Sequence, residues 1–239
     1  MKKLFVGVLC VALSLSVQGK EVNMTSPDGK YQFTLSDSGG QLHYSLTWNG
    51  KQTVKPSLLG INANVEWRDG VEIGTVDSSR KDTIWHPVYG ERSEIKDCYH
   101  AWKIVVNRQN GRDKLILDVR AYDEGIAFRY HFPGGQYLKI TDEYTEYTMP
   151  EGTKAYFTPK AQTPYSYLPL ENWPGESDRP LLLTLADGGY VCLAEAQVVD
   201  YVRTKFNVSP TKKNTVISAM YGPVEDIAPY STPWRVIMC

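Results

Sequence analysis

Residues 30–51 read KYQFTLSDSGGQLHYSLTWNGK, and this stretch decides the fold class. Apolar residues occupy alternate positions on both sides of a polar, glycine-containing turn: Tyr31, Phe33, Leu35, Leu42, Tyr44, Leu46 and Trp48. A side-chain period of two places such residues on one face of a β-strand. Asn49-Gly50 follows directly, and Asn-Gly favours a two-residue hairpin turn because both turn positions need φ > 0. The stretch therefore predicts antiparallel strands joined by tight turns.

The same pattern continues along the chain. Further strands are predicted at 102–106, 115–119, 126–132, 181–185, 190–193, 198–202, 215–220 and 234–238. Asn110-Gly111 and Asp123-Glu124-Gly125 mark turns between the first three of these segments. Such spacing predicts an all-β sandwich or barrel, and more strands than the seven of an immunoglobulin domain favour one large antiparallel sandwich. Four tryptophans lie within or beside strand patterns, where core packing is expected: Trp48, Trp67, Trp85 and Trp102.

The first 19 residues predict a secretory signal peptide. A short basic start, Lys2-Lys3, precedes an apolar run from Leu4 to Val17 that is too short to cross a bilayer. We therefore expect a mature chain of residues 20–239 that is periplasmic or secreted and has no membrane span. The alternative is an N-terminal membrane anchor.

Composition excludes several classes of protein. Hydrophobic residues make up 42% of the chain, enough to build a core and to exclude a mainly disordered state. The 26 basic and 27 acidic residues give a net charge of −1, so the basic surface of a nucleic-acid-binding protein is not expected. Three cysteines follow the signal segment, and this odd number argues against a disulfide-framework fold. The four histidines are scattered singly, so local spacing predicts no zinc site.

One region breaks the alternation. Residues 157–180 read FTPKAQTPYSYLPLENWPGESDRP, with five prolines, and proline removes a donor that a central strand needs. Long irregular segments in compact β domains are commonly functional loops, so we look for a site here. Trp173 and Tyr165 offer aromatic planes that could stack on a sugar ring, or could instead pin the loop to the sandwich.

The sequence contains none of the usual catalytic templates, such as a Gly-x-Ser-x-Gly elbow or a His-Glu-x-x-His zinc motif. Carboxylates in loop-like settings are Glu91, Glu94, Glu171, Glu176 and Glu195. For each of them the alternative is a solvated surface side chain.

Several blocks, in this order, make the chain resemble glycoside hydrolase family 97. They are TSPDGKYQFTL (25–35), KPSLLGI (55–61), WHPVYGERSEIKDCYHAWKI (85–104), FRYHFP (128–133), LAEAQVVDY (193–201) and TPWRVIM (232–238). The resemblance implies an exported, exo-acting, calcium-dependent α-glycosidase built from an N-terminal super-β-sandwich, a (β/α)8 barrel and a small C-terminal β domain. The sequence YLPLENWPGESDRPL looks more like the α-galactosidase branch than the α-glucosidase branch.

The resemblance covers only the sandwich, so it implies that residues 20–239 are the N-terminal domain and that no catalytic residue lies in this chain. The chain alone is then expected to be inactive. Its partners would be the barrel domain of the same enzyme and an α-linked oligosaccharide. Glu171 would be a calcium ligand, with Glu176 as the alternative, and Trp173 and Asn172 would bind substrate. The competing hypotheses are a free-standing carbohydrate-binding module and a structural or adhesive surface sandwich.

Overall fold

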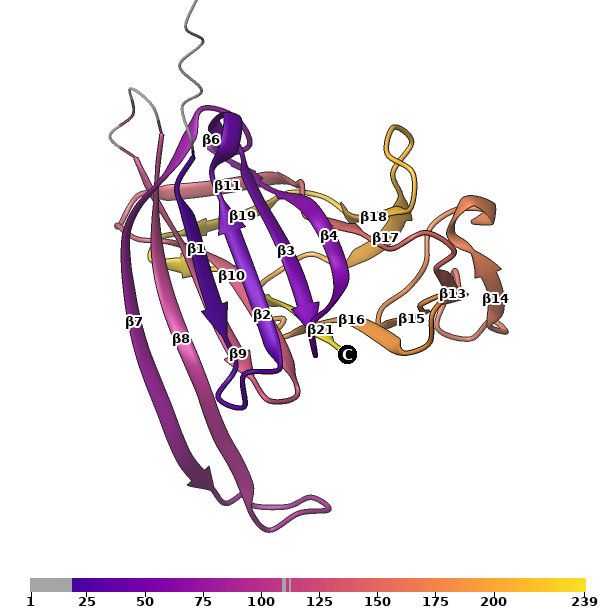
Figure 1. The fold of residues 1–239 in the computed structure, drawn as a ribbon. Coiled ribbons are helices and arrows are strands. Elements are labelled where there is room, and N and C mark those ends of the chain that lie inside the picture. Colours follow the sequence, from indigo (N-terminus) through magenta and orange to yellow (C-terminus); the bar gives the residue numbers. More distant parts are fainter. Residues whose placement is uncertain (1–18, 109–110, 112) are drawn as a thin grey trace, which may run out of the picture.

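The alternating segments form a β-sandwich in the computed structural model of the chain, which describes residues 19–108, 111 and 113–239 (Figure 1). The predicted signal peptide, apart from Gly19, and Asn110 of the second predicted turn lie outside the described residues. Within the described part of the chain, no helix is long and apolar enough to cross a membrane.

Seven strands form one layer of the sandwich, all paired antiparallel. In sheet order they are β1 (Glu21–Thr25), β2 (Tyr31–Ser36), β3 (Leu42–Trp48), β4 (Lys51–Leu59), β12 (Glu146–Thr148), β18 (Thr215–Met220) and β17 (Thr204–Val208). The turn between β3 and β4 is the predicted Asn-Gly hairpin, because Asn49 and Gly50 have φ of 49° and 76°. A short 3-10 turn, η1 (Ser38–Gly40), connects β2 to β3.

A ten-stranded sheet forms the second layer. In order it contains β14 (Ser166–Pro169), β13 (Lys154–Phe157), β15 (Leu181–Thr184), β16 (Tyr190–Ala196), β21 (Trp234–Met238), β10 (Gly125–Phe132), β9 (Lys114–Tyr122), β8 (Ile95–Arg108) and β7 (Val71–Trp85), while β20 (Tyr230–Ser231) pairs with β10. A third, four-stranded sheet contains β19 (Val224–Ile227), β11 (Tyr137–Glu143), β5 (Ile61–Ala63) and β6 (Val65–Glu66). The predicted all-β sandwich is confirmed.

Aromatic side chains join the two large sheets through the core. Phe33 on β2 stacks on Tyr44 of β3 with ring centroids 5.1 Å apart, and Tyr44 contacts Phe128 of β10 at 5.5 Å. All three side chains are buried. Each of them is an apolar residue of a segment whose alternation predicted a strand. The alternation therefore identified side chains that join the two layers.

One strand expectation was wrong. Residues 198–202 form no strand: Gln197 and Asp200 have positive φ, which interrupts an extended chain, and Val198 and Val199 are exposed. The irregular region 157–180 does contain a short strand, β14. It pairs only with β13 at the end of the sheet, which is where proline is tolerated.

Trp85 also departs from the expected core packing. It is 50% exposed because β7 and β8 run beyond the sandwich as a two-stranded ribbon (Figure 1). Trp67 is buried as expected, and Trp48 and Trp102 pack half-buried against the core.

Candidate functional site: the η2 loop and the buried charges behind it

The loop after β14 is fixed to the sandwich by one leucine. The 3-10 turn η2 (Leu170–Asn172) follows β14 directly, and its Leu170 side chain is buried in the main core. The Leu170 amide donates to the Thr153 carbonyl at 3.4 Å. Glu171 and Asn172, the next residues, are exposed. A buried anchor followed by exposed polar residues presents those polar groups at a defined place on the surface.

Trp173 ends this turn and packs on the sandwich. Its ring lies 5.4 Å from that of Phe157 at 60°, and the side chain is half-buried. Its Nε1 is enclosed and has no hydrogen-bond partner among the described residues. Trp173 therefore holds the loop in place, as the alternative reading of the sequence allowed. A sugar-binding role for Trp173 and Asn172 stays a prediction.

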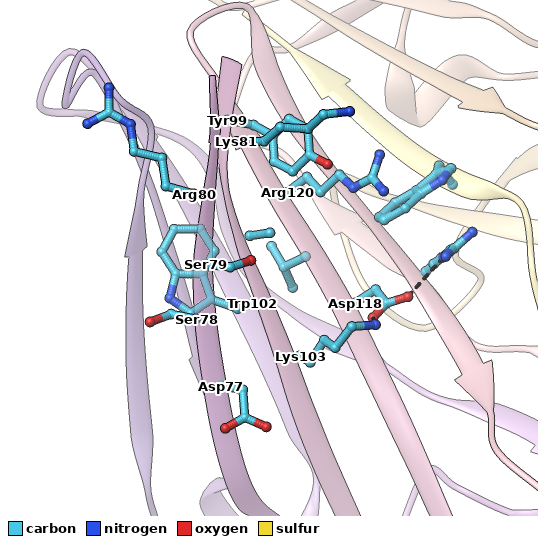
Figure 2. Close-up of a pocket in the computed structure, with 14 residues that line it drawn as sticks. Asp77, Ser78, Ser79, Arg80, Lys81, Tyr99, Trp102, Lys103, Asp118 and Arg120 are labelled. Carbon is cyan, nitrogen blue, oxygen red and sulfur yellow. Dashed lines mark hydrogen bonds and ion pairs between the residues drawn. The ribbon is translucent and has the colours of Figure 1, made fainter. Parts of the chain in front are cut away.

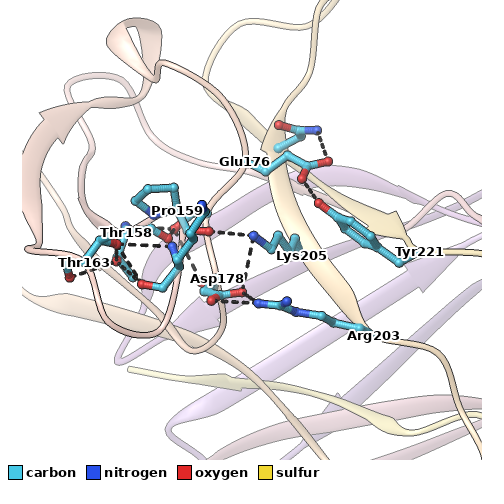
Figure 3. A network of polar contacts seen from close by, with 11 residues as sticks. Thr158, Pro159, Thr163, Glu176, Asp178, Arg203, Lys205 and Tyr221 are labelled. Atoms are coloured by element: carbon cyan, nitrogen blue, oxygen red, sulfur yellow. Dashed lines mark hydrogen bonds and ion pairs between the residues drawn. The ribbon is translucent and has the colours of Figure 1, made fainter.

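A second set of contacts fixes the end of the loop (Figure 3). Ser177 is fully buried and exchanges two backbone hydrogen bonds, of 2.8 and 2.9 Å, with Phe206. The Asp178 carboxylate accepts from Arg203 Nη2 at 2.7 and 3.0 Å and lies 3.7 Å from Lys205 Nζ. Lys205 Nζ also donates to the Pro159 carbonyl at 2.6 Å. Arg203 and β17 thus hold both ends of the irregular region 157–180, at Pro159 and at Ser177-Asp178.

The two candidate calcium ligands have different surroundings. Glu176 accepts hydrogen bonds from the Tyr221 hydroxyl and, at 3.5 Å, from Asn207 Nδ2 (Figure 3). No hydrogen bond or ion pair engages the Glu171 carboxylate within the described part of the chain. Glu171 is therefore the carboxylate of this loop that can take an external ligand without losing an internal contact.

Glu171 borders an open cleft with a volume of ≈ 650 Å³. The charged residues lining it are Glu151, Glu171, Lys212 and Lys213. Among residues 19–108, 111 and 113–239, no three His, Cys, Asp or Glu side chains gather closely enough to hold a metal ion. Glu171 can supply one carboxylate to a cation, whereas calcium takes about six to eight oxygen ligands.

Behind the loop, a charge cluster lies inside the sandwich. Arg235 on β21 and Glu143 on β11 are both buried, and Arg235 Nε donates to Glu143 Oε1 at 2.7 Å. Arg235 Nη1 also donates to Glu195 Oε2 at 2.8 Å. Burial alone would raise the pKa of Glu143, but the charge and hydrogen bonds of Arg235 hold that pKa below its ordinary value. The same carboxylate holds the pKa of Arg235 well above its ordinary value, against the effect of burial.

Glu195 is not a loop carboxylate as its sequence context suggested. It lies within β16, faces the interior and also accepts from Thr204 Oγ1 at 2.9 Å. Glu143 and Glu195 are both bound to Arg235; the Glu143 side chain is 0% exposed and the Glu195 side chain is 18% exposed. Because one arginine holds both carboxylates, we interpret their role as structural.

Arg179 completes the cluster from the loop side. Its side chain is buried, with Nη2 donating to Ser218 Oγ at 3.0 Å and the guanidinium lying over the Phe206 ring at 3.8 Å. Burial and the nearby Arg235 charge lower its pKa. Nε and Nη1 have no hydrogen-bond partner among the described residues, and neither has the buried hydroxyl of Tyr147, whose pKa burial raises to about 12. The sequence analysis did not predict this cluster. Arg235 stands at an inward position of the WRVIM strand, and a charged residue there could have indicated a buried ion pair.

A second cleft, of ≈ 500 Å³, lies on the outer face of the ten-stranded sheet, away from the core (Figure 2). The Arg120 guanidinium lies over the Tyr99 ring at 4.7 Å and over the Trp234 ring at 4.5 Å. Asp118 accepts from Lys103 Nζ and from the Nε of Arg129, each at 3.0 Å.

The remaining candidate carboxylates, Glu91 and Glu94, are exposed in the turn between β7 and β8.

Residues 24–239 match the family model described as glycosyl-hydrolase 97 N-terminal. A retaining α-galactosidase of Bacteroides thetaiotaomicron is 25% identical over 93% of this chain and 36% of its own length.

Two solved structures have a similar fold. A glycoside hydrolase family 97 enzyme from Pseudoalteromonas sp. strain K8, solved with acarbose, has a TM-score of 0.84 at 23% identity, over 91% of this chain and 35% of that one. A β-arabinopyranosidase has a TM-score of 0.83 at 21% identity, over 91% of this chain and 40% of that one. The chain therefore spans between a third and two fifths of the length of these relatives.

Proposed function

The chain belongs to the glycosyl-hydrolase 97 N-terminal family, and on this premise we propose that it is the non-catalytic sandwich of an exported, exo-acting, calcium-dependent α-glycosidase. In that enzyme it packs on a (β/α)8 catalytic domain and contributes the η2 loop to the sugar pocket. The observation that carries the proposal is the η2 loop itself: Leu170 and Trp173 anchor it, and Glu171 and Asn172 stand exposed between them.

The carboxylates of the sandwich support a catalytic centre outside this chain. Hydrolysis of a glycosidic bond needs two carboxyl groups about 5–9.5 Å apart that both reach the substrate. Glu143 and Glu195 are bound to Arg235 in the interior, and Glu176 is engaged by Tyr221. Glu171 stands apart from them at the surface.

The calcium requirement fits the chemistry of Glu171. An exposed carboxylate supplies the hard oxygen donors that calcium prefers, and the rest of its ligands would come from the catalytic domain. When bound, the ion would supply a fixed positive charge and link the η2 loop to that domain. Glu171, Asn172 and Trp173 would then position this loop beside the substrate.

The name of the Bacteroides relative supports an α-galactoside as substrate over an α-glucoside. Export rests on residues 1–19, with their basic start and apolar run. A free-standing carbohydrate-binding module is not favoured, because the Trp173 ring that would carry sugar binding packs on Phe157.

A fusion tests the proposal. The chain is joined to the region of the Bacteroides retaining α-galactosidase that it does not match, and hydrolysis of nitrophenyl α-galactoside and α-glucoside is measured with and without calcium. We expect activity in the fusion that falls on chelation, greater activity on the α-galactoside, and none for the chain alone. Hydrolysis by the chain alone would place catalysis within these residues and overturn the proposal.

A further inference from the structure

Two buried side chains behind the η2 loop carry polar atoms without partners. The Arg179 side chain is 7% exposed, and its Nε and Nη1 have no hydrogen-bond partner among the described residues. Within the same part of the chain, the hydroxyl of Tyr147 on β12 is also unpartnered, and this side chain is fully buried. Native proteins seldom leave buried donors unsatisfied, so a group of them points to a bound water or ion.

The two side chains meet at the ring of Phe206 on β17. The guanidinium carbon of Arg179 lies 3.8 Å from the centroid of that ring, and the Tyr147 ring meets it edge to face at 5.8 Å. Burial raises the pKa of the Tyr147 hydroxyl, and the next largest influence on that pKa is the Arg179 charge, which lowers it. The free N–H groups and the free O–H group therefore lie at one enclosed place.

The neighbouring carboxylates do not satisfy these donors. Both oxygens of Glu143 and the Oε2 of Glu195 accept from Arg235. Glu195 Oε2 lies 3.7 Å from Arg179 Nε, which is beyond hydrogen-bond range. The site thus has donors in excess of acceptors. A water molecule would bring two more donors that need partners, whereas a halide ion only accepts.

The electrostatic surroundings of Arg179 also favour an anion. Within the described part of the chain its one ion pair is the 3.7 Å contact with Glu195, and Arg235 holds that carboxylate at 2.8 Å. Burial and, after it, the positive charge of Arg235 lower the pKa of Arg179. A bound anion would offset both effects, because it would neutralise a buried charge that lacks a close counter-ion.

The position of the site limits the size of the ion. Arg179, Tyr147 and Phe206 are enclosed in the sandwich, where an anion as large as phosphate would force the layers apart. Ser218 accepts from Arg179 Nη2 at 3.0 Å and also lines an open cleft of ≈ 420 Å³. A monatomic ion could enter from this cleft with local movement of side chains.

We propose that Arg179 and Tyr147 bind a halide ion inside the sandwich, with chloride as the natural occupant. The ion would accept from Arg179 Nη1 and from the Tyr147 hydroxyl, on the side of the guanidinium away from Glu195. It would join β12 to the end of the irregular region 157–180 and so stabilise the folded chain. This site does not depend on the calcium ligand proposed at Glu171.

Urea denaturation in mixtures of sodium chloride and sodium gluconate, at constant ionic strength, tests the proposal in solution. We expect the urea midpoint to rise with chloride and then to level off, because a ligand bound only by the folded state stabilises it until the site is filled. Tyr147→Phe should weaken the apparent affinity for chloride by about tenfold, since one hydrogen bond to a charged group is lost. The control Tyr165→Phe, at a side chain 64% exposed, should leave that affinity unchanged.

Arg179→Met should abolish the chloride dependence, and if this variant does not fold, Tyr147→Phe carries the test. Crystals of the chain soaked in sodium bromide locate the ion by anomalous scattering, and we expect a peak beside Arg179 and Tyr147.

Three outcomes would overturn the proposal. The first is ordered water at this place without an anomalous signal. The second is a chloride effect that is as large in Tyr147→Phe and Arg179→Met as in the unchanged chain, which would be a bulk salt effect. The third is a bromide peak with no effect of chloride on the urea midpoint, which would mean binding at crystal concentration only.

Discussion

Arg235 and Glu143 form a buried ion pair that joins the ten-stranded sheet to the four-stranded sheet across 92 residues of sequence. Glu195 shares the same guanidinium from the neighbouring strand, β16. The pair lies behind the η2 loop, because Arg179 extends from the end of that loop toward the same cluster.

Removing the arginine should be costly. Arg235→Met leaves Glu143 as an uncompensated buried charge, and we expect the free energy of unfolding to fall by about 3–5 kcal/mol. Urea denaturation of the isolated chain measures this. The matched control is Arg80→Met, whose exposed ion pair with Asp82 should contribute less than about 1 kcal/mol. Equal effects of the two substitutions would contradict a structural role for the cluster.

Stability should fall in acid. The folded-state pKa of Glu143 lies below its ordinary value of 4.5, so its contribution is present above that value and is lost as pH falls through the folded pKa. Hydrogen bonds from Lys30 and Ser26 hold the pKa of Asp28 at about 2, which acts in the same direction. The urea concentration at the midpoint of unfolding should fall successively at about pH 6, 4 and 3, which span the ordinary pKa range of carboxyl groups. A midpoint that rises on acidification would contradict the assignment.

Trp173→Ala should destabilise the chain, because the ring packs on Phe157. Buried Trp→Ala changes cost about 3–5 kcal/mol, and for this half-buried ring we expect about 2–3 kcal/mol, measured as above. Tyr165→Ala, at a side chain 64% exposed in the same irregular region 157–180, is the control and should change stability by less than about 0.5 kcal/mol. If both variants were equally stable, Trp173 would not be an anchor.

Glu171→Gln in the fusion should raise the calcium concentration needed for half-maximal activity by about tenfold or more, because one charged oxygen ligand is lost. Glu176→Gln should leave that concentration unchanged and weaken only the contact with Tyr221. Activity titrated with calcium after chelation measures both. The reverse result would assign the ligand to Glu176.

The arrangement of the η2 loop shows how far sequence reasoning reached. Five prolines predicted an irregular region at 157–180, and the structure retains it apart from the edge strand β14 and the η2 turn. The sequence could not separate Glu171 from Glu176, because their difference arises from Asn207 on β17 and Tyr221 in the segment after β18.

Alternating side chains predicted strands such as β2, β3, β9 and β10 and many residues of the core, because a period of two sorts each strand into a buried and an exposed face before any partner is chosen. Tertiary structure alone decided which charges meet, since Glu143, Glu195 and Arg235 come from three separate strands whose pairing no local pattern specifies. It also decided that Trp85 is exposed. β7 and β8 continue past the edge of the opposing layer, where no core remains to cover Trp85.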